Sequence, residues 1–167
     1  YRAGVRLMHL SYNRRNYIAD GCTEEADAGI SDLGKELIKR MNKVGIIVDV
    51  PHTGLRSSTE AAQCSEKPIM ASHTAARALF DFIRCKDDAT LKAIADNDGL
   101  VGVYACPGML GGSEDLNMML DHICADENMP GTILFAYNGQ NYYFNRSMVH
   151  AYDAVVRELN SRGIQVT

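Results

Sequence analysis

The sequence predicts an α/β fold made of parallel βα units, because two patterns alternate along its 167 residues. Short apolar runs rich in β-branched residues, such as 46–50, are typical of strands buried on both faces. Longer stretches with helical spacing separate them, and this alternation indicates a parallel sheet with right-handed connections. A closed (β/α)8 TIM-type barrel needs about 250 residues, and about five units are present. We therefore expect one domain, 1–167, that is part of such a barrel, half of an assembly, or a smaller open sheet.

Each predicted element begins or ends at a recognisable signal. Ser31 is placed to cap the first helix, and Gly45 follows it where a C-terminal glycine is expected. The predicted helices cover residues 33–44, 57–64, 88–97, 113–123 and 146–160. The predicted strands cover residues 4–10, 46–50, 68–72, 100–104 and 132–137. The polar stretch 11–29 is expected to be a loop.

Composition argues against several classes of protein. The formal net charge is −4, so the chain lacks the concentrated basic face of a nucleic-acid-binding protein. No run of about 18 apolar residues is present, so no membrane-spanning helix is predicted. No two cysteines have CxxC spacing, which argues against a zinc knuckle or a thioredoxin-like motif, and the odd number of cysteines disfavours a complete disulfide framework. We therefore predict reduced thiols, which favours a cytoplasmic protein. The cysteines are Cys22, Cys64, Cys85, Cys106 and Cys124.

Two histidines follow successive predicted strands. His52 comes after the run 46–50, and His73 comes after the run 68–72. The carboxyl ends of parallel strands form the edge where ligands bind in α/β folds. Because neighbouring strands lie about 4.8 Å apart, the two imidazoles can reach one metal ion, and imidazole suits zinc. A lone histidine is more often an exposed or hydrogen-bonded polar residue, so the metal interpretation depends on the pair.

Other polar residues carry weaker signals. Asp49 could orient an imidazole from behind, although a hydrogen bond to a neighbouring loop is the favoured interpretation. His9 alternates with apolar neighbours in the first strand, and we expect it to point elsewhere in the barrel. His122 and His150 fall on predicted helices, where we expect them to be exposed.

Longer motifs add a family resemblance. The chain resembles the renal (membrane) dipeptidase family, in its bacterial form, over roughly residues 1–123, and no resemblance is followed over 124–167. The two histidine motifs, 45–54 and 68–77, keep the family's separation of twenty-one positions between the histidines. The other motifs that carry the resemblance are 1–8, 10–16, 20–24, 27–31 and 99–104.

The resemblance implies an amidohydrolase-like barrel and a metallodipeptidase that hydrolyses dipeptides with two zinc ions. It implies that His52 and His73 hold the second zinc. It places Arg84 where the family grips the substrate carboxylate, for which a planar guanidinium is suited. It places Tyr12 where mammalian members have a histidine near the substrate. The alternatives are an exposed loop arginine for Arg84 and simple packing for Tyr12.

Several of the family's site residues have no counterpart in this sequence. They are the His-x-Asp pair of the first zinc, the bridging glutamate expected before Tyr1, and the acid/base aspartate, so no catalytic residue is identified. The alternative function is therefore a non-catalytic, shortened relative that acts through oligomerisation or ligand binding. Unpaired strand edges invite association, and a homo-oligomer is expected. A third possibility is an unrelated open-sheet protein that matches the motifs by chance.

Overall fold

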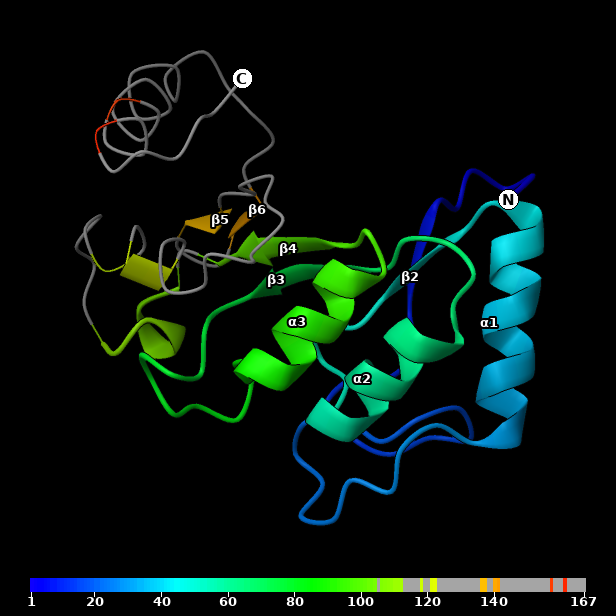
Figure 1. Ribbon diagram of the computed structural model, residues 1–167, viewed down its shortest axis with the longest axis horizontal. Helices are drawn as coiled ribbons and strands as arrows, with labels where there is room; N and C mark the ends of the chain where they lie inside the picture. Colours follow the sequence, from blue (N-terminus) through cyan, green and yellow to red (C-terminus); the bar gives the residue numbers. More distant parts are fainter. Residues whose placement is uncertain are drawn as a thin grey trace.

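The computed structural model shows a parallel sheet of four strands in the order β1-β2-β3-β4 (Figure 1). The strands are β1 (Leu7–His9), β2 (Ile47–Asp49), β3 (Met70–Thr74) and β4 (Leu100–Val103). The structure describes residues 1–104, 106–112, 118, 121–122, 136–137, 140–141, 157 and 161. Strands that are neighbours in the chain are neighbours in the sheet, as successive βα units require. The predicted fold class, a partial assembly of parallel βα units, is confirmed.

Three helices connect these strands and lie along the same side of the sheet (Figure 1). They are α1 (Asp32–Val44), α2 (Leu55–Cys64) and α3 (Asp88–Asp96), and a short 3-10 helix, η1 (Pro107–Met109), follows β4. Helix residues Ile38 and Ile94 pack with strand residues Val48 and Val101 in one buried cluster. This apolar layer between helices and sheet is the main source of stability, since burying each such side chain contributes about 1.5–3 kcal/mol.

The helix ends follow the sequence signals closely. The Ser31 hydroxyl accepts a hydrogen bond from the Gly34 amide at 3.0 Å, and Gly45 ends α1 with a φ of 80°. Both predicted caps are confirmed. Helix α2 begins two residues before the predicted start at residue 57, and its N-cap, Gly54, has no capping side chain. The Asp27 carboxylate supplies the cap from the distant first loop by accepting from the Ser57 amide at 3.1 Å.

The strand 46–50 is not buried on both faces. Ile47 is 44% exposed and its partner Leu7 is 38% exposed, whereas Val48 is buried. Side chains alternate between the two faces of a strand, and among the described residues the helices cover only one face. The homo-oligomer, which was expected from unpaired strand edges, stays a prediction.

Two short strands follow η1, β5 (Ala136–Tyr137) and β6 (Gln140–Asn141), and they pair antiparallel with each other. The described end of the predicted run 132–137 therefore belongs to a hairpin pair and is not a further parallel strand. The Asn138-Gly139 dipeptide between the two strands is a strong hairpin signal in the sequence. Most of the predicted helices 113–123 and 146–160 lies outside the described residues, as do His150 and Cys124.

Composition led to predictions about membrane-spanning helices and about the cysteines, and both can be compared with the described residues. No helix among them is long and apolar enough to cross a bilayer. The four cysteines that the structure describes carry free thiols.

Candidate metal-binding site

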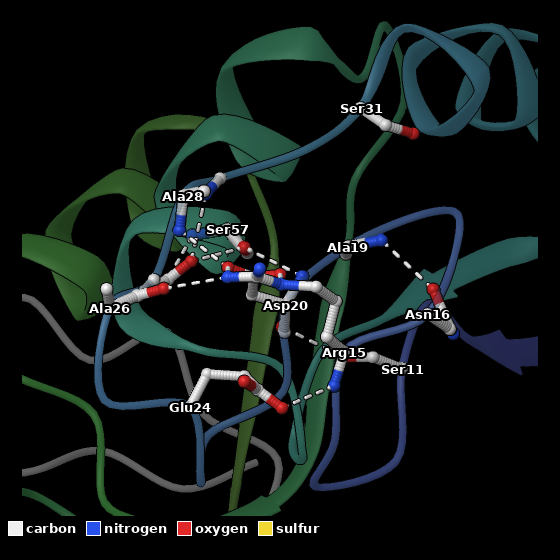
Figure 2. Close-up of polar contacts among 12 residues, drawn as sticks. Ser11, Arg15, Asn16, Ala19, Asp20, Glu24, Ala26, Ala28, Ser31 and Ser57 are labelled. Carbon is white, nitrogen blue, oxygen red and sulfur yellow. Dashed lines mark hydrogen bonds and ion pairs between the residues drawn. The ribbon is translucent and has the colours of Figure 1, made fainter.

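The loop that follows β1 is held in place by a buried carboxylate (Figure 2). Asp20 receives two hydrogen bonds from Arg15, Nε to Oδ1 at 2.5 Å and Nη2 to Oδ2 at 2.8 Å, and a third from the Ala28 amide at 2.6 Å. The Arg15 guanidinium holds the pKa of Asp20 below its ordinary value, so Asp20 is charged at neutral pH. Ser57 at the start of α2 lies against the same loop, with its Oγ 3.3 Å from the Asp20 amide. The loop is therefore fixed beside α2 at the carboxyl ends of the strands.

His52 and His73 lie together at this edge of the sheet. Their Nε2 atoms are 3.0 Å apart, and their ring centroids are 5.0 Å apart in an edge-on arrangement. The sequence predicted this proximity from the positions of the two residues after successive strands. The register of β3 against β4 shifts between Ala71 and Thr74, the stretch that contains His73, and such irregularities can re-aim side chains at functional edges.

Asn13 determines which nitrogen of His52 carries the proton. The Asn13 amide oxygen lies 2.7 Å from His52 Nδ1, and because that oxygen only accepts, Nδ1 donates and Nε2 keeps its lone pair. Asn13 has a φ of 58°, in the left-handed region. A Cβ on Gly21 would lie 2.0 Å from the Asn13 backbone, so only glycine fits there. This close approach holds Asn13 against His52.

Ser72 determines the corresponding proton of His73. The Ser72 hydroxyl donates to Asp49 Oδ2 at 2.7 Å and lies 2.9 Å from His73 Nδ1. Since its one proton goes to the carboxylate, the hydroxyl accepts from His73 Nδ1. The His73 Nε2 atom is then also a free lone pair, and it faces the lone pair of His52.

Two facing lone pairs 3.0 Å apart repel each other unless a cation lies against both. Burial, and next the Arg84 cation, lower the pKa of His52 to about 3 and that of His73 to about 4. Both imidazoles are therefore neutral at neutral pH, as metal ligation requires. Two nitrogens on one tetrahedral zinc lie roughly 3.3 Å apart, since each Zn–N bond is about 2.0–2.1 Å. The pair fits a zinc ion, with a small adjustment.

Arg84 lies half-buried beside the two histidines. Its Nε donates to the Pro51 carbonyl at 3.3 Å, and burial lowers the pKa of the guanidinium. Its Nη2 atom is buried and has no hydrogen-bond partner in the part of the chain that the structure describes. This is not the exposed loop arginine that the sequence left as an alternative. A buried, unpaired guanidinium nitrogen is costly, and an anionic oxygen from a substrate would satisfy it.

Two tyrosines flank the histidines. The Tyr12 ring stacks on His52 with centroids 4.1 Å apart, while the residue as a whole is 67% exposed. Tyr104 meets His73 edge-on at 5.5 Å. The alternative for Tyr12 was simple packing at a strand end. An exposed ring that stacks on a candidate metal ligand does not fit that alternative. Sequence reasoning missed Tyr104, which is one residue beyond β4 and therefore at the same edge.

Two expectations about histidines were wrong. His9 does not point away from the pair, since its ring centroid lies 5.7 Å from that of His52 and 5.8 Å from that of His73. Its neighbour Leu10 is 2% exposed in the helix-facing core, so strand alternation turns His9 to the opposite face, where the site lies. His122 is not exposed on a helix: it is 1% exposed, and its Nδ1 accepts from the Ala76 amide at 3.2 Å. The Asp49 carboxylate accepts a hydrogen bond from the amide of Ser72 on the neighbouring strand β3, and its Oδ2 lies 2.8 Å from His9 Nε2.

Lys86 is a fully buried cation beneath the site. Its Nζ donates to the Thr53 carbonyl at 2.5 Å and to the Ser58 hydroxyl at 2.8 Å, and no carboxylate pairs with it among the described residues. The Lys86 amide also donates to the Ala75 carbonyl at 3.0 Å. Lys86 therefore ties the segment that carries Arg84 to the turn that carries His52. Sequence reasoning missed it, because a single lysine in a loop gives no signal of burial.

Burial lowers the pKa of Lys86 from 10.5 to about 7, and this predicts a pH-dependent stability. Below about pH 7 the lysine is charged in both the folded and the unfolded chain, and the full cost of burying that charge lowers the free energy of unfolding. Between the two pKa values the unfolded chain binds a proton that the folded chain does not, so the free energy of unfolding rises with pH. We expect a rise of about 2 kcal/mol from roughly pH 7 to 9.

Urea unfolding of the chain and of a Lys86→Met variant at several pH values measures this effect. The variant keeps an unbranched side chain of similar length without the amine, and other titrating groups cancel when the two chains are compared. Parallel pH profiles for both chains would contradict the assignment of the rise to Lys86.

Two family models match the chain. The model described as membrane dipeptidase (Peptidase family M19) matches residues 1–129. A second, described as a family of unknown function (DUF5722), matches residues 112–167. Among curated proteins, Dipeptidase tcpJ of Claviceps purpurea is 28% identical over 128 residues, which are 74% of this chain and 30% of the relative. An uncharacterized dipeptidase of Schizosaccharomyces pombe is 28% identical over 79% of this chain and 34% of the relative.

Solved structures agree with the family model. An amidohydrolase from Pseudomonas aeruginosa is 32% identical, with a TM-score of 0.76 over 84% of this chain and 45% of that chain. The probable dipeptidase PvdM from the same organism is 27% identical, with a TM-score of 0.63 over 96% of this chain and 44% of that chain. The chain thus spans under half the length of each of these relatives. Since the family model covers residues 1–129 of 167, the chain belongs to the membrane dipeptidase family, peptidase family M19.

Proposed function

We propose that this protein is a zinc-dependent metallodipeptidase-type hydrolase and that His52 and His73 are zinc ligands. The single observation that carries the proposal is the pair of Nε2 atoms that face each other 3.0 Å apart. Membership of the dipeptidase family supports it, as do the dipeptidase relatives. Since the chain spans under half of those relatives, a complete site would draw on residues beyond this pair.

The residues around the pair suggest how a dipeptide is held. When zinc is bound, it supplies an activated water and a polarised carbonyl, and two ions are expected in a complete site. Asn13 and Ser72 orient the two imidazoles and fix their tautomers, which leaves both Nε2 atoms available to the ion. The free Nη2 of Arg84 receives the C-terminal carboxylate of the substrate. This fixed carboxylate clamp restricts the substrate to very short peptides.

Tyr12 has an accessory role in the proposal. Its ring rests on His52, and the exposed phenol group can donate a hydrogen bond to a bound substrate. A phenol is a much weaker acid than an imidazolium, so Tyr12 does not replace a histidine as a general acid. We therefore assign it to substrate binding.

A second function has two observations in its favour. Among the residues that the structure describes, no three His, Cys, Asp or Glu side chains are placed to hold one metal ion. A shortened, non-catalytic relative that binds ligands or oligomerises would need no complete metal centre. The exposed Leu7 and Ile47 on the uncovered sheet face suit association with another copy of the chain.

Metal removal and restoration distinguish the two functions. The full chain is purified, its zinc content is measured, and hydrolysis of a simple dipeptide is followed before and after dialysis against a chelator. We expect zinc in the purified chain, loss of hydrolysis in the apoprotein, and recovery on addition of zinc. A chain that binds no zinc, or whose hydrolysis survives complete zinc removal, would contradict the metallodipeptidase proposal.

A further inference from the structure

Arg84 and Lys86 donate to the backbone on the two sides of His52. The Arg84 Nε donates to the Pro51 carbonyl at 3.3 Å. The Lys86 Nζ donates to the Thr53 carbonyl at 2.5 Å. Pro51 and Thr53 are the residues that directly precede and follow His52 in the chain. Two cationic side chains of one short segment therefore hold the turn that carries His52 at two points.

The two contacts differ in strength. The Lys86 bond is short and its donor is charged, which makes it a strong hydrogen bond. The Arg84 bond is at the long end of the range for an N–H donor, and its Nη2 has no hydrogen-bond partner in the described part of the chain. A guanidinium that shifts to meet an anion weakens its hold on the turn. The constant point of attachment is therefore Lys86.

The backbone of Lys86 is anchored on the side of His73. Its amide donates to the Ala75 carbonyl at 3.0 Å, and its carbonyl accepts from the Arg77 amide at 2.8 Å. These two residues follow β3, the strand that carries His73. Lys86 thus connects the segment after His73 with the turn of His52, and this connection can set the spacing between the two imidazoles.

A lysine at this place is costly for the fold. Lys86 is 1% exposed, and no carboxylate forms an ion pair with it in the part of the chain that the structure describes. Its Nζ also donates to Ser58 in the first turn of α2, where the helix dipole disfavours a cation. Costs of this kind are typical of residues that serve a site, because stability and activity make competing demands there.

We propose that Lys86 is a positioning residue, which holds the turn of His52 against the segment after His73 and thereby fixes the distance between the two imidazoles. Its side-chain hydrogen bonds go to the Thr53 carbonyl and the Ser58 hydroxyl, so it acts through the backbone of the turn. The inference rests on the proposed function only for its consequence at the site, which is a lower affinity for zinc in the absence of the lysine. The placement of His52 can be measured without a metal.

A Lys86→Met variant tests the inference on the metal-free chain. The variant removes the donor and keeps a side chain of similar length, and Lys92→Met is the matched control because Lys92 is an exposed lysine of α3. Nuclear Overhauser effects between ring protons report the position of His52, whose ring centroid lies 4.1 Å from that of Tyr12 and 5.0 Å from that of His73. We expect both cross-peaks in the unsubstituted chain and in Lys92→Met, and their loss in Lys86→Met.

Melting temperatures separate a positioning role from a general structural one. Below about pH 7, where Lys86 is charged, Lys86→Met should melt no lower than the unsubstituted chain, because it no longer buries a charge. Zinc affinity, measured by competition with a chromogenic chelator, should nevertheless fall by roughly 10- to 100-fold, as it does for other residues that orient ligands. If the variant loses both cross-peaks together with much of its stability, Lys86 supports the fold as a whole and the positioning role is overturned.

The other outcomes separate this inference from the proposed function. If Lys86→Met keeps both cross-peaks, the turn holds without the lysine, and the inference is overturned whether or not the chain binds zinc. If the cross-peaks are lost but the unsubstituted chain binds no zinc, the positioning role stands and the metallodipeptidase proposal fails. Should Lys86→Met not fold, a scalar coupling between the Lys86 Nζ and the Thr53 carbonyl carbon in the unsubstituted chain tests the contact directly, and its absence overturns the inference.

Discussion

Replacing His52 with alanine is expected to lower both zinc affinity and dipeptide hydrolysis by at least about 1,000-fold. The side chain supplies one of the two Nε2 atoms that face each other at 3.0 Å, and the neighbouring imidazole of His9 has its Nε2 engaged with Asp49 at 2.8 Å. A catalytic metal contributes several kcal/mol of charge stabilisation, and each 1.36 kcal/mol corresponds to about tenfold in rate. Isothermal titration with zinc and initial-rate assays of the zinc-saturated variant measure the two losses.

Combining the His52 and His73 substitutions makes this experiment more decisive, because it shows whether the two losses of affinity add. His73→Ala should have the same effect as His52→Ala, and the double variant should be little worse than either single variant, because residues that act as a unit are lost together. His122→Ala is a matched control, since His122 lies outside the cluster and bonds the Ala76 amide. Independent, additive losses from His52 and His73 would contradict a shared ion.

The parallel βα architecture could be read from the sequence because its signals are local. Ser31 and Gly45 cap α1 as their residue types predict, and the β-branched runs became strands. The start of α2 was misplaced because its cap is Asp27, thirty residues away in the chain. A capping contact over that distance depends on how the first loop folds, and no spacing rule contains it.

The candidate site likewise contains residues whose positions the sequence could predict and residues whose positions it could not. The proximity of His52 and His73 follows from strand order alone, so the sequence was sufficient to predict it. The place of His9 was misjudged although the alternation of β1 was recognised. The alternation separates His9 from Leu10, but which of the two faces carries the site depends on where the helices pack. Asn13 was missed because its left-handed backbone and its bond to His52 leave no signature in composition or spacing.

Replacing Arg84 with methionine is expected to lower kcat/KM for a dipeptide by roughly 100- to 1,000-fold. The free Nη2 is buried beside the histidines, so a substrate carboxylate bound there is paired away from bulk water. Removing one partner of such a buried charge pair costs about 2–5 kcal/mol, which is about tenfold per 1.4 kcal/mol. Most of the loss should be in KM, since the carboxylate is bound equally in the substrate and in the transition state. Steady-state kinetics of the zinc-saturated chain measure both parameters.

A change of substrate separates carboxylate binding from any structural role of Arg84. The arginine also donates to the Pro51 carbonyl next to His52, so a loss of activity alone could come from a displaced ligand. If Arg84 grips the carboxylate, the unsubstituted chain should prefer a dipeptide to its C-terminal amide by a large factor. The methionine variant should lose that preference while it hydrolyses the amide as well as before. Arg84→Lys should recover part of the preference, because an ammonium supplies the charge without the bidentate fork. If the methionine variant hydrolyses both substrates equally poorly relative to the unsubstituted chain, Arg84 acts through Pro51 and His52, and the carboxylate must be held elsewhere.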